Sequence, residues 1–527
     1  MLFQTPLFFG FFAVVMALYA LTMRRLRLQN AIVMLASYAF YAVWDLRFLS
    51  LIITATTVAY LCGQGASGAR IEARQLRGAL LFLALGSLAS FAPGLPETGF
   101  YLGLCAALGA AIAGFAAIVN RLTAERRAQA SVTAGVVFNL ALLGFFKYFN
   151  FFADSLSDLA NGLGADLGYV TLKVVLPVGI SFFTFQKLAY IIDVKRGRTA
   201  AATDIIKFGA FVAYFPQLVA GPIERAGHLL RQFDTPRRLT AHGISTGAGL
   251  FLWGMYKKVV IADNISPIAN RVFDNPGAMT SGELLVGLLA FTFQIFCDFS
   301  GYSDMARGLA RMMGLDLMIN FNIPYVSRTP SEFWERWHIS LSSWLRDYLY
   351  IPLGGNRGGP LLTYRNLFVT MLLGGLWHGA SWTFVAWGAF HGAILIGYRL
   401  LGVDRWLAHQ PRAGTAVAGL RDTSLVAIMF VLTMFGWLLF RAPDLAAVGD
   451  YLAGLGALRG LGDAPWATLA FYLTPLLLVQ AFQLWCRDLE FLPRLPGFAR
   501  LNAALFLVFS LAFLAPLTSA AFIYFDF

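Results

Sequence analysis

Long apolar runs separated by short charged segments make up most of this chain of 527 residues. A helix needs about 20 apolar residues to cross a bilayer, so the shorter runs must extend into their flanks. Together with shorter interrupted runs, the pattern predicts an all-α, polytopic membrane protein of about 11–13 helices plus re-entrant segments. The expected spans are 2–23, 31–44, 48–62, 79–92, 99–119, 131–146, 174–193, 243–262, 281–299, 425–440, 466–486 and 501–522.

The composition agrees with a membrane protein. Hydrophobic residues form 58% of the chain and charged residues 13%, whereas soluble domains have about 25% charged residues. The net charge of +12 does not indicate nucleic-acid binding, because the basic residues are divided among short loops. We interpret them as topology signals.

The sign of the loops alternates along the chain. Arginines at 24, 25 and 27 follow the first run, whereas the next loop carries Asp45. The positive-inside rule then places the N-terminus outside, and the last three runs carry the C-terminus outside as well. Residues 2–23 have neither a basic segment before them nor a small-residue cleavage site after them, so we expect a retained helix rather than a signal peptide.

Two places break this alternation. The run 205–222 has basic flanks on both sides and contains Pro216 and Pro222, which is typical of a re-entrant segment. Lys257 and Lys258 fall near the outer end of an expected span. They either extend to the membrane surface or face a polar cavity.

A capping box, Thr329 to Glu332, has a proline at the first helical position. It predicts a helix that begins at Pro330, lies along the cytoplasmic interface and ends near Pro352. On a helical wheel Trp337 and His338 share its apolar face. His338 is either a packing histidine or part of a site.

The runs 367–377 and 382–398 also have basic flanks, so they predict a hairpin whose turn is HGAS. From Asn366 to His378 a helix rises roughly 18 Å, against a hydrocarbon core of about 30 Å. His378 is therefore expected inside the membrane, where an ionisable residue suggests function. Low dielectric favours the neutral imidazole that a general base requires, and glycines at 374, 375 and 379 leave space around it.

A polar cluster at 297–308 contains Asp298 and Asp304. Either aspartate is able to orient a histidine, or the cluster solvates a helix end, with Asp304 paired to Arg307. His391 is expected to pack, and the histidines at 228, 242 and 409 lie in polar loops. A metal site is not expected, because there is no HExxH and no histidine pair at helical spacing.

Five strings in order carry a family resemblance. They are LPVGISFFTFQKLAYIIDV, FPQLVAGPIER, FCDFSGYSDMARG, WERWHISLSSWLRDYLYIPLGGNRGG and GGLWHGASWTFVAWGAFHG. They resemble the membrane-bound O-acyltransferase family, in its bacterial alginate O-acetylation type. The resemblance implies one domain, 1–527, around a central channel, with N-terminal helices at 1–150, a catalytic core at 174–400 and C-terminal helices at 420–527.

The resemblance also implies catalytic roles for His378 and His338. We take six further residues as candidates for lining the substrate channel: Trp337, Trp377, Asp298, Asp304, Arg328 and Asn320.

The implied function is an O-acetyltransferase in the bacterial inner membrane. It would move acetyl from a cytoplasmic thioester, such as acetyl-CoA, toward an extracytoplasmic polysaccharide, with a partner protein outside, membrane lipid around it and no bound cofactor. A transporter or channel without chemistry is the alternative, because intramembrane histidines and broken helices also suit transport. Two different Trp-His motifs favour the enzyme.

Overall fold

The computed structural model describes residues 1–87, 98–164, 174–408, 416–516 and 522–523. These residues form helices and connecting loops, with no strand among them, which confirms the all-α prediction. Within the described ranges, seven helical stretches are long and apolar enough to cross a membrane. They are Arg47–Ala66, Leu102–Asn120, Ala124–Gly162, Ser281–Met312, Gly419–Arg441, Trp466–Cys486 and Gly497–Leu514. His409 lies outside the described residues.

The chain forms two compact units. The first contains Met1–Gly247 and Leu309–Leu317, and the second contains Ala248–Gly308 and Met318–Phe527. This boundary falls inside the segment 174–400, for which the family resemblance implies one catalytic core. The single-domain organisation stays a prediction.

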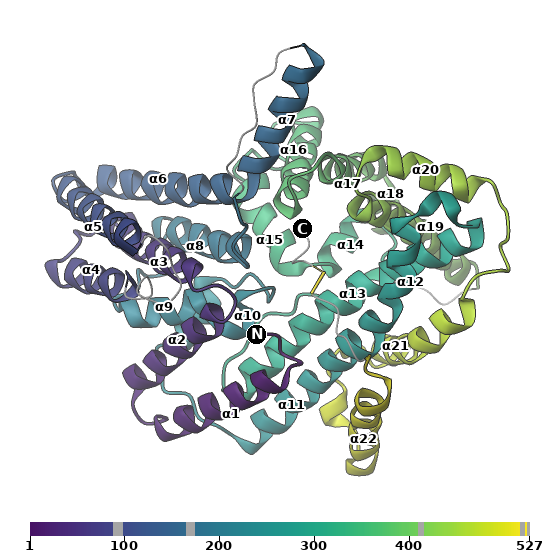
Figure 1. The fold of residues 1–527 in the computed structure, drawn as a ribbon, viewed down its shortest axis with the longest axis horizontal. Helices are drawn as coiled ribbons and strands as arrows, with labels where there is room; N and C mark the ends of the chain where they lie inside the picture. Colours follow the sequence, from purple (N-terminus) through teal and green to yellow (C-terminus); the bar gives the residue numbers. More distant parts are fainter. Residues whose placement is uncertain (88–97, 165–173, 409–415, 517–521, 524–527) are drawn as a thin grey trace. The chain divides into compact units, whose positions relative to one another are not determined.

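In the first unit, helix α3 is surrounded by other helices and packs on α4, α6, α8 and α9 (Figure 1). Gly63 of α3 makes one of these contacts possible, since a Cβ there would lie 2.4 Å from the ring of Tyr190. Small residues allow membrane helices to approach this closely. The elements are α1 (Pro6–Leu21), α2 (Leu26–Ala42), α3 (Arg47–Ala66), α4 (Ala73–Ser87), α5 (Thr98–Asn120), α6 (Ala124–Leu143), η2 (Gly144–Tyr148), α7 (Phe149–Gly162), α8 (Ile180–Lys195), α9 (Ile205–Ala213), α10 (Phe215–Leu218), η3 (Ala226–Leu230) and the start of α11 (Ala241–Met255).

The run 205–222 is interrupted, as predicted. Helix α9 ends at Ala213, Tyr214 leaves the helical conformation, and α10 has only four residues. Neither helix is long enough to span a bilayer.

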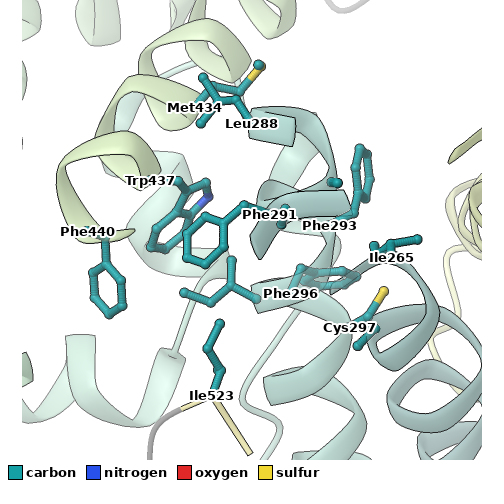
Figure 2. Close-up of a cluster of buried hydrophobic side chains, with 14 of the residues drawn as sticks. Ile265, Leu288, Phe291, Phe293, Phe296, Cys297, Met434, Trp437, Phe440 and Ile523 are labelled. Atoms are coloured by element: carbon teal, nitrogen blue, oxygen red, sulfur yellow. The ribbon is translucent and has the colours of Figure 1, made fainter. Parts of the chain in front are cut away.

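In the second unit, helix α13 forms the core, and 89% of its most apolar window is buried. Figure 2 shows Phe291, Phe293 and Phe296 of α13 in one buried cluster with Trp437 of α19. The elements are the end of α11, η4 (Tyr256–Ala262), α12 (Asp263–Asp274), η5 (Pro276–Ala278), most of α13 (Ser281–Met312), η6 (Pro324–Val326), α14 (Pro330–Arg336), α15 (Ile339–Leu345), η7 (Arg346–Tyr350), α16 (Pro360–His378), α17 (Trp382–Leu400), α18 (Val403–Ala408), α19 (Ala416–Arg441), α20 (Leu445–Gly456), α21 (Trp466–Cys486), η8 (Leu492–Arg494) and α22 (Gly497–Leu514).

The prediction of one continuous helix from Pro330 to Pro352 is wrong. It begins as predicted, because the Thr329 side chain accepts a hydrogen bond from the Glu332 backbone at 3.2 Å. It then stops at Arg336, and a second helix, α15, begins at Ile339.

The break has a physical cause in the neighbouring loop. The backbone N–H of Asn322 donates to the carbonyl of Arg336 at 2.9 Å, and the N–H of Ile339 donates to the carbonyl of Asn320 at 3.0 Å. These bonds replace the intrahelical bonds that a continuous helix would form. As a result, His338 lies at the bend between α14 and α15 and not on a helix face.

Candidate active site

His338 is held at this bend by backbone conformation and by burial. Its φ of 44° is in the left-handed region, which non-glycine residues rarely adopt and which is often found at functional sites. The side chain is 0% exposed, and the Phe299 ring lies edge-on to the imidazole at 4.7 Å between centroids.

Asn320 orients the imidazole of His338. Its Oδ1 lies 3.2 Å from His338 Nδ1 and also accepts from the backbone N–H of Ser340 at 3.2 Å. The N–H contact identifies this atom as the amide oxygen, which only accepts hydrogen bonds. Nδ1 of His338 is therefore assigned the proton, and Nε2 carries the basic lone pair.

His378 is the last residue of α16, at the turn of the predicted hairpin. The hairpin is confirmed: α16 and α17 lie side by side, and the Ser381 side chain caps α17 (Figure 1). Gly375 and Gly388 permit this approach, since a Cβ on Gly375 would lie 2.2 Å from the carbonyl oxygen of Phe384. The His378 side chain is only 4% exposed.

The two histidines meet although they are 40 positions apart in the chain. Their ring centroids are 6.5 Å apart. Trp377 lies beside both, at 6.0 Å from His338 and 5.0 Å from His378, while Trp387 contacts His378 at 4.9 Å. The described structure thus brings together His338, His378, Trp377 and Asn320 from the predicted set.

Trp337 does not belong to this group of residues and packs in the hydrophobic core. It is 1% exposed and contacts Phe321 at 5.0 Å and Trp437 at 4.7 Å. Its ring belongs to the hydrophobic core of the second unit.

The two aspartates of the polar cluster bind lysines. Asp298 lies 2.9 Å from Lys258, and Asp304 lies 2.8 Å from Lys257. The predicted pair of Asp304 with Arg307 is also present, at 3.6 Å.

Both lysines are also buried, so the interpretation that they extend to the membrane surface is wrong. Their side chains are 4–5% exposed. A buried charge costs several kcal/mol unless it is paired, and the aspartates of α13 supply the partners. The polar-cavity alternative is confirmed for Lys257, which lines a cavity of about 40 Å³ with Ser300 and Asp304.

Arg328, the remaining candidate for the channel, makes structural contacts. Arg328 is 38% exposed and pairs with Glu332 at 3.3 Å and with Asp422 at 3.6 Å, which supports the start of α14. His391 is buried against Trp387, with ring centroids 4.5 Å apart, in the packing position that was expected.

The sequence reasoning missed the bend at His338 and the two rings that enclose the histidines, Phe299 and Trp387. The bend has no local signal, because the loop at 320–322 creates it. The rings had a weak signal, since Phe299 is next to Asp298 and Trp387 follows the HGAS turn in the same motif.

Comparisons with known proteins identify the family of this chain. Residues 178–412 match the model of MBOAT, the membrane-bound O-acyltransferase family. The chain is 41% identical over 450 residues to "Probable alginate O-acetylase AlgI" of Azotobacter vinelandii, which covers 84% of this chain and 76% of that one. It is 42% identical to the protein of that name from Pseudomonas aeruginosa, over 84% of this chain and 73% of that one. The "Peptidoglycan O-acetyltransferase" of Helicobacter pylori is 36% identical, over 62% and 64% of the two chains.

The matched residues 178–412 include the bend at His338 and the hairpin that ends at His378. The identity to the first two relatives extends over most of both chains. This protein belongs to the membrane-bound O-acyltransferase family.

Proposed function

We propose that the chain is an O-acetyltransferase of the bacterial inner membrane that transfers acetyl from a cytoplasmic thioester, such as acetyl-CoA, toward hydroxyls of an extracytoplasmic polysaccharide. The relatives named for alginate and peptidoglycan O-acetylation support acetyl as the group and a polysaccharide as the acceptor. The family supports an enzyme over a transporter. A partner protein outside the membrane completes delivery to the polymer in this proposal.

One observation carries the proposal: two buried histidines, one at the bend between α14 and α15 and one at the end of α16, have ring centroids 6.5 Å apart. We assign His378 as the base that takes the proton from the acceptor hydroxyl. The alkoxide oxygen then attacks the thioester carbonyl, the C–O bond forms, the C–S bond breaks, and the proton is returned to the thiolate sulfur. We place His338, which Asn320 orients, on the side of the reacting groups opposite to His378.

The donor and its side of entry are tested together in sealed vesicles. Inverted and right-side-out vesicles contain the protein and its partner, and in both the acceptor polymer is on the extracytoplasmic side of the membrane. Both receive, from outside, acetyl-CoA with a labelled acetyl group, which does not cross the membrane. Label is expected in the polymer only with inverted vesicles, because their cytoplasmic face is outside. Equal labelling in both orientations contradicts the proposed donor side, and no labelling with acetyl-CoA or another acetyl thioester contradicts the proposed reaction.

A further inference from the structure

A cavity lined by three arginines lies where helix α21 ends, outside the site described above. Its volume is about 540 Å³, and its wall includes Arg336, Arg487 and Arg494 together with Asp488 and Glu490. All of these residues belong to the second unit.

Four of these five charges are already balanced. Arg336 pairs with Glu332 at 2.9 Å, Arg494 pairs with Asp488 at 2.9 Å, and Glu490 pairs with Arg307. Arg487 has no ion-pair partner within the described part of the chain. The cavity therefore has one uncompensated positive charge.

The position of the cavity beside two candidate membrane helices indicates that an anionic ligand would come from the lipid. Helices α21 and α22 are candidate spans whose apolar windows are only 17% and 11% buried, so both present side chains to lipid. Arg487 directly follows α21, and Arg494 precedes α22. Basic pockets at the end of membrane helices are suited to lipid headgroups.

The apolar surroundings also suit a lipid. Leu484 lines the cavity and is 44% exposed, and Trp485 beside it is 79% exposed. Tryptophans are enriched at the membrane interface. The exposed face of α21 continues with Leu477 and Leu478, along which acyl chains would lie.

We propose that this cavity binds the phosphodiester of an anionic phospholipid, with Arg487 as the main phosphate contact. A phosphodiester has one negative charge, which matches the single uncompensated arginine. Coenzyme A carries several negative charges, which the paired arginines do not balance. This proposal does not depend on the proposed acetyl transfer.

The test is lipid binding by native mass spectrometry of the full chain in detergent, titrated with phosphatidylglycerol or phosphatidylcholine. Phosphatidylglycerol is expected to bind more tightly, and Arg487→Gln is expected to weaken it about tenfold, as loss of one charge-assisted contact would. Arg487→Lys keeps the charge and is expected to keep the preference. Arg500→Gln is the matched control, because Arg500 is exposed on α22 and does not line the cavity.

Three results would overturn the proposal. The first is equal binding of the two lipids, and the second is an equal loss of affinity for phosphatidylglycerol in Arg487→Gln and Arg500→Gln. The third is displacement of phosphatidylglycerol by phosphopantetheine or coenzyme A at micromolar concentration, which would assign the cavity to a thioester donor instead.

Discussion

The side-chain amide of Asn320 contacts both His338 and the beginning of α15. Its oxygen accepts from Ser340 Oγ at 2.9 Å in addition to the contacts with His338 Nδ1 and the Ser340 backbone. One buried atom thus sets the tautomer of the imidazole and completes the bend on which His338 lies.

Asn320→Leu is expected to reduce acetyl transfer about 100-fold, because misplacement of a reacting group by about 1 Å has that effect. The free energy of unfolding is expected to fall by about 1–3 kcal/mol, since the Ser340 N–H loses a buried acceptor. Initial rates with labelled acetyl-CoA and thermal unfolding in detergent measure the two effects.

Asn502→Leu is the control, because Asn502 is exposed on α22. Transfer by Asn320→Leu at the parent rate would show that the amide does not orient His338 for the reaction.

The α16–α17 hairpin depends on backbone contact between its helices. A Cβ on Gly388 would lie 2.6 Å from the carbonyl oxygen of Met371, in the same way that Gly375 faces Phe384. These two glycines, one on each side of the turn in sequence, bring α16 and α17 together near His378.

Gly375→Ala is expected to separate the hairpin and displace His378. Overpacking of this kind costs about 1–3 kcal/mol, so a lower unfolding temperature and a lower transfer rate are expected. Gly397→Ala is the matched control, because no atom lies within 4 Å of a Cβ at that position of α17. Equal unfolding temperatures for the two variants would contradict the packing role of Gly375.

The short helix η3 is held to the segment Leu309–Leu317 by His228. Its Nδ1 lies 2.7 Å from Glu224 and its Nε2 lies 3.5 Å from Asp316, all within the first unit. Hydrogen bonds to Asp316 and Glu224 raise the pKa of His228 to about 10 from its ordinary 6.5.

This raised pKa predicts a pH-dependent stability. The contribution of protonated His228 to the free energy of unfolding is complete below pH 6.5, where His228 is also protonated in the unfolded chain. It is lost as the pH rises toward about 10. The unfolding temperature is therefore expected to fall over this range, and less so in His228→Gln. His242→Gln, at an exposed position, is the control. Identical slopes for parent and His228→Gln would contradict the ion pairs.

Local signals predicted the elements well, and long-range contacts explain the failures. The capping box at Thr329, the HGAS turn and the interruption before Pro216 each depend on neighbours in sequence, and each is present. The bend at His338 depends on Asn320, 18 positions earlier. Lys258 also pairs with the nearby Asp263, but the α13 partners of Lys257 and Lys258, Asp304 and Asp298, lie far along the chain, so sequence spacing did not reveal them.

The sidedness of the whole chain is still a prediction, although its character as a multi-pass membrane protein follows from the family and the seven candidate spans. The basic loops predict that both termini lie outside. A reporter fused after Leu514, at the end of α22, tests this directly.

Alkaline phosphatase at that position is expected to be active and green fluorescent protein dark, because only the first folds after export. A fusion after Ala408, at the end of α18, is the comparison, because it lies near a basic segment that is expected on the cytoplasmic side. The reverse pattern at Leu514 would place the C-terminus in the cytoplasm and invert the proposed donor side.

The most direct test of the proposed chemistry is the transfer rate of His378→Ala beside His242→Ala. Loss of a general base reduces rates about 10²–10⁴-fold, so His378→Ala is expected to approach background while it remains folded and membrane-inserted. His242→Ala is expected to match the parent. A folded His378→Ala that transfers acetyl at the parent rate would contradict the assignment of His378 as the base.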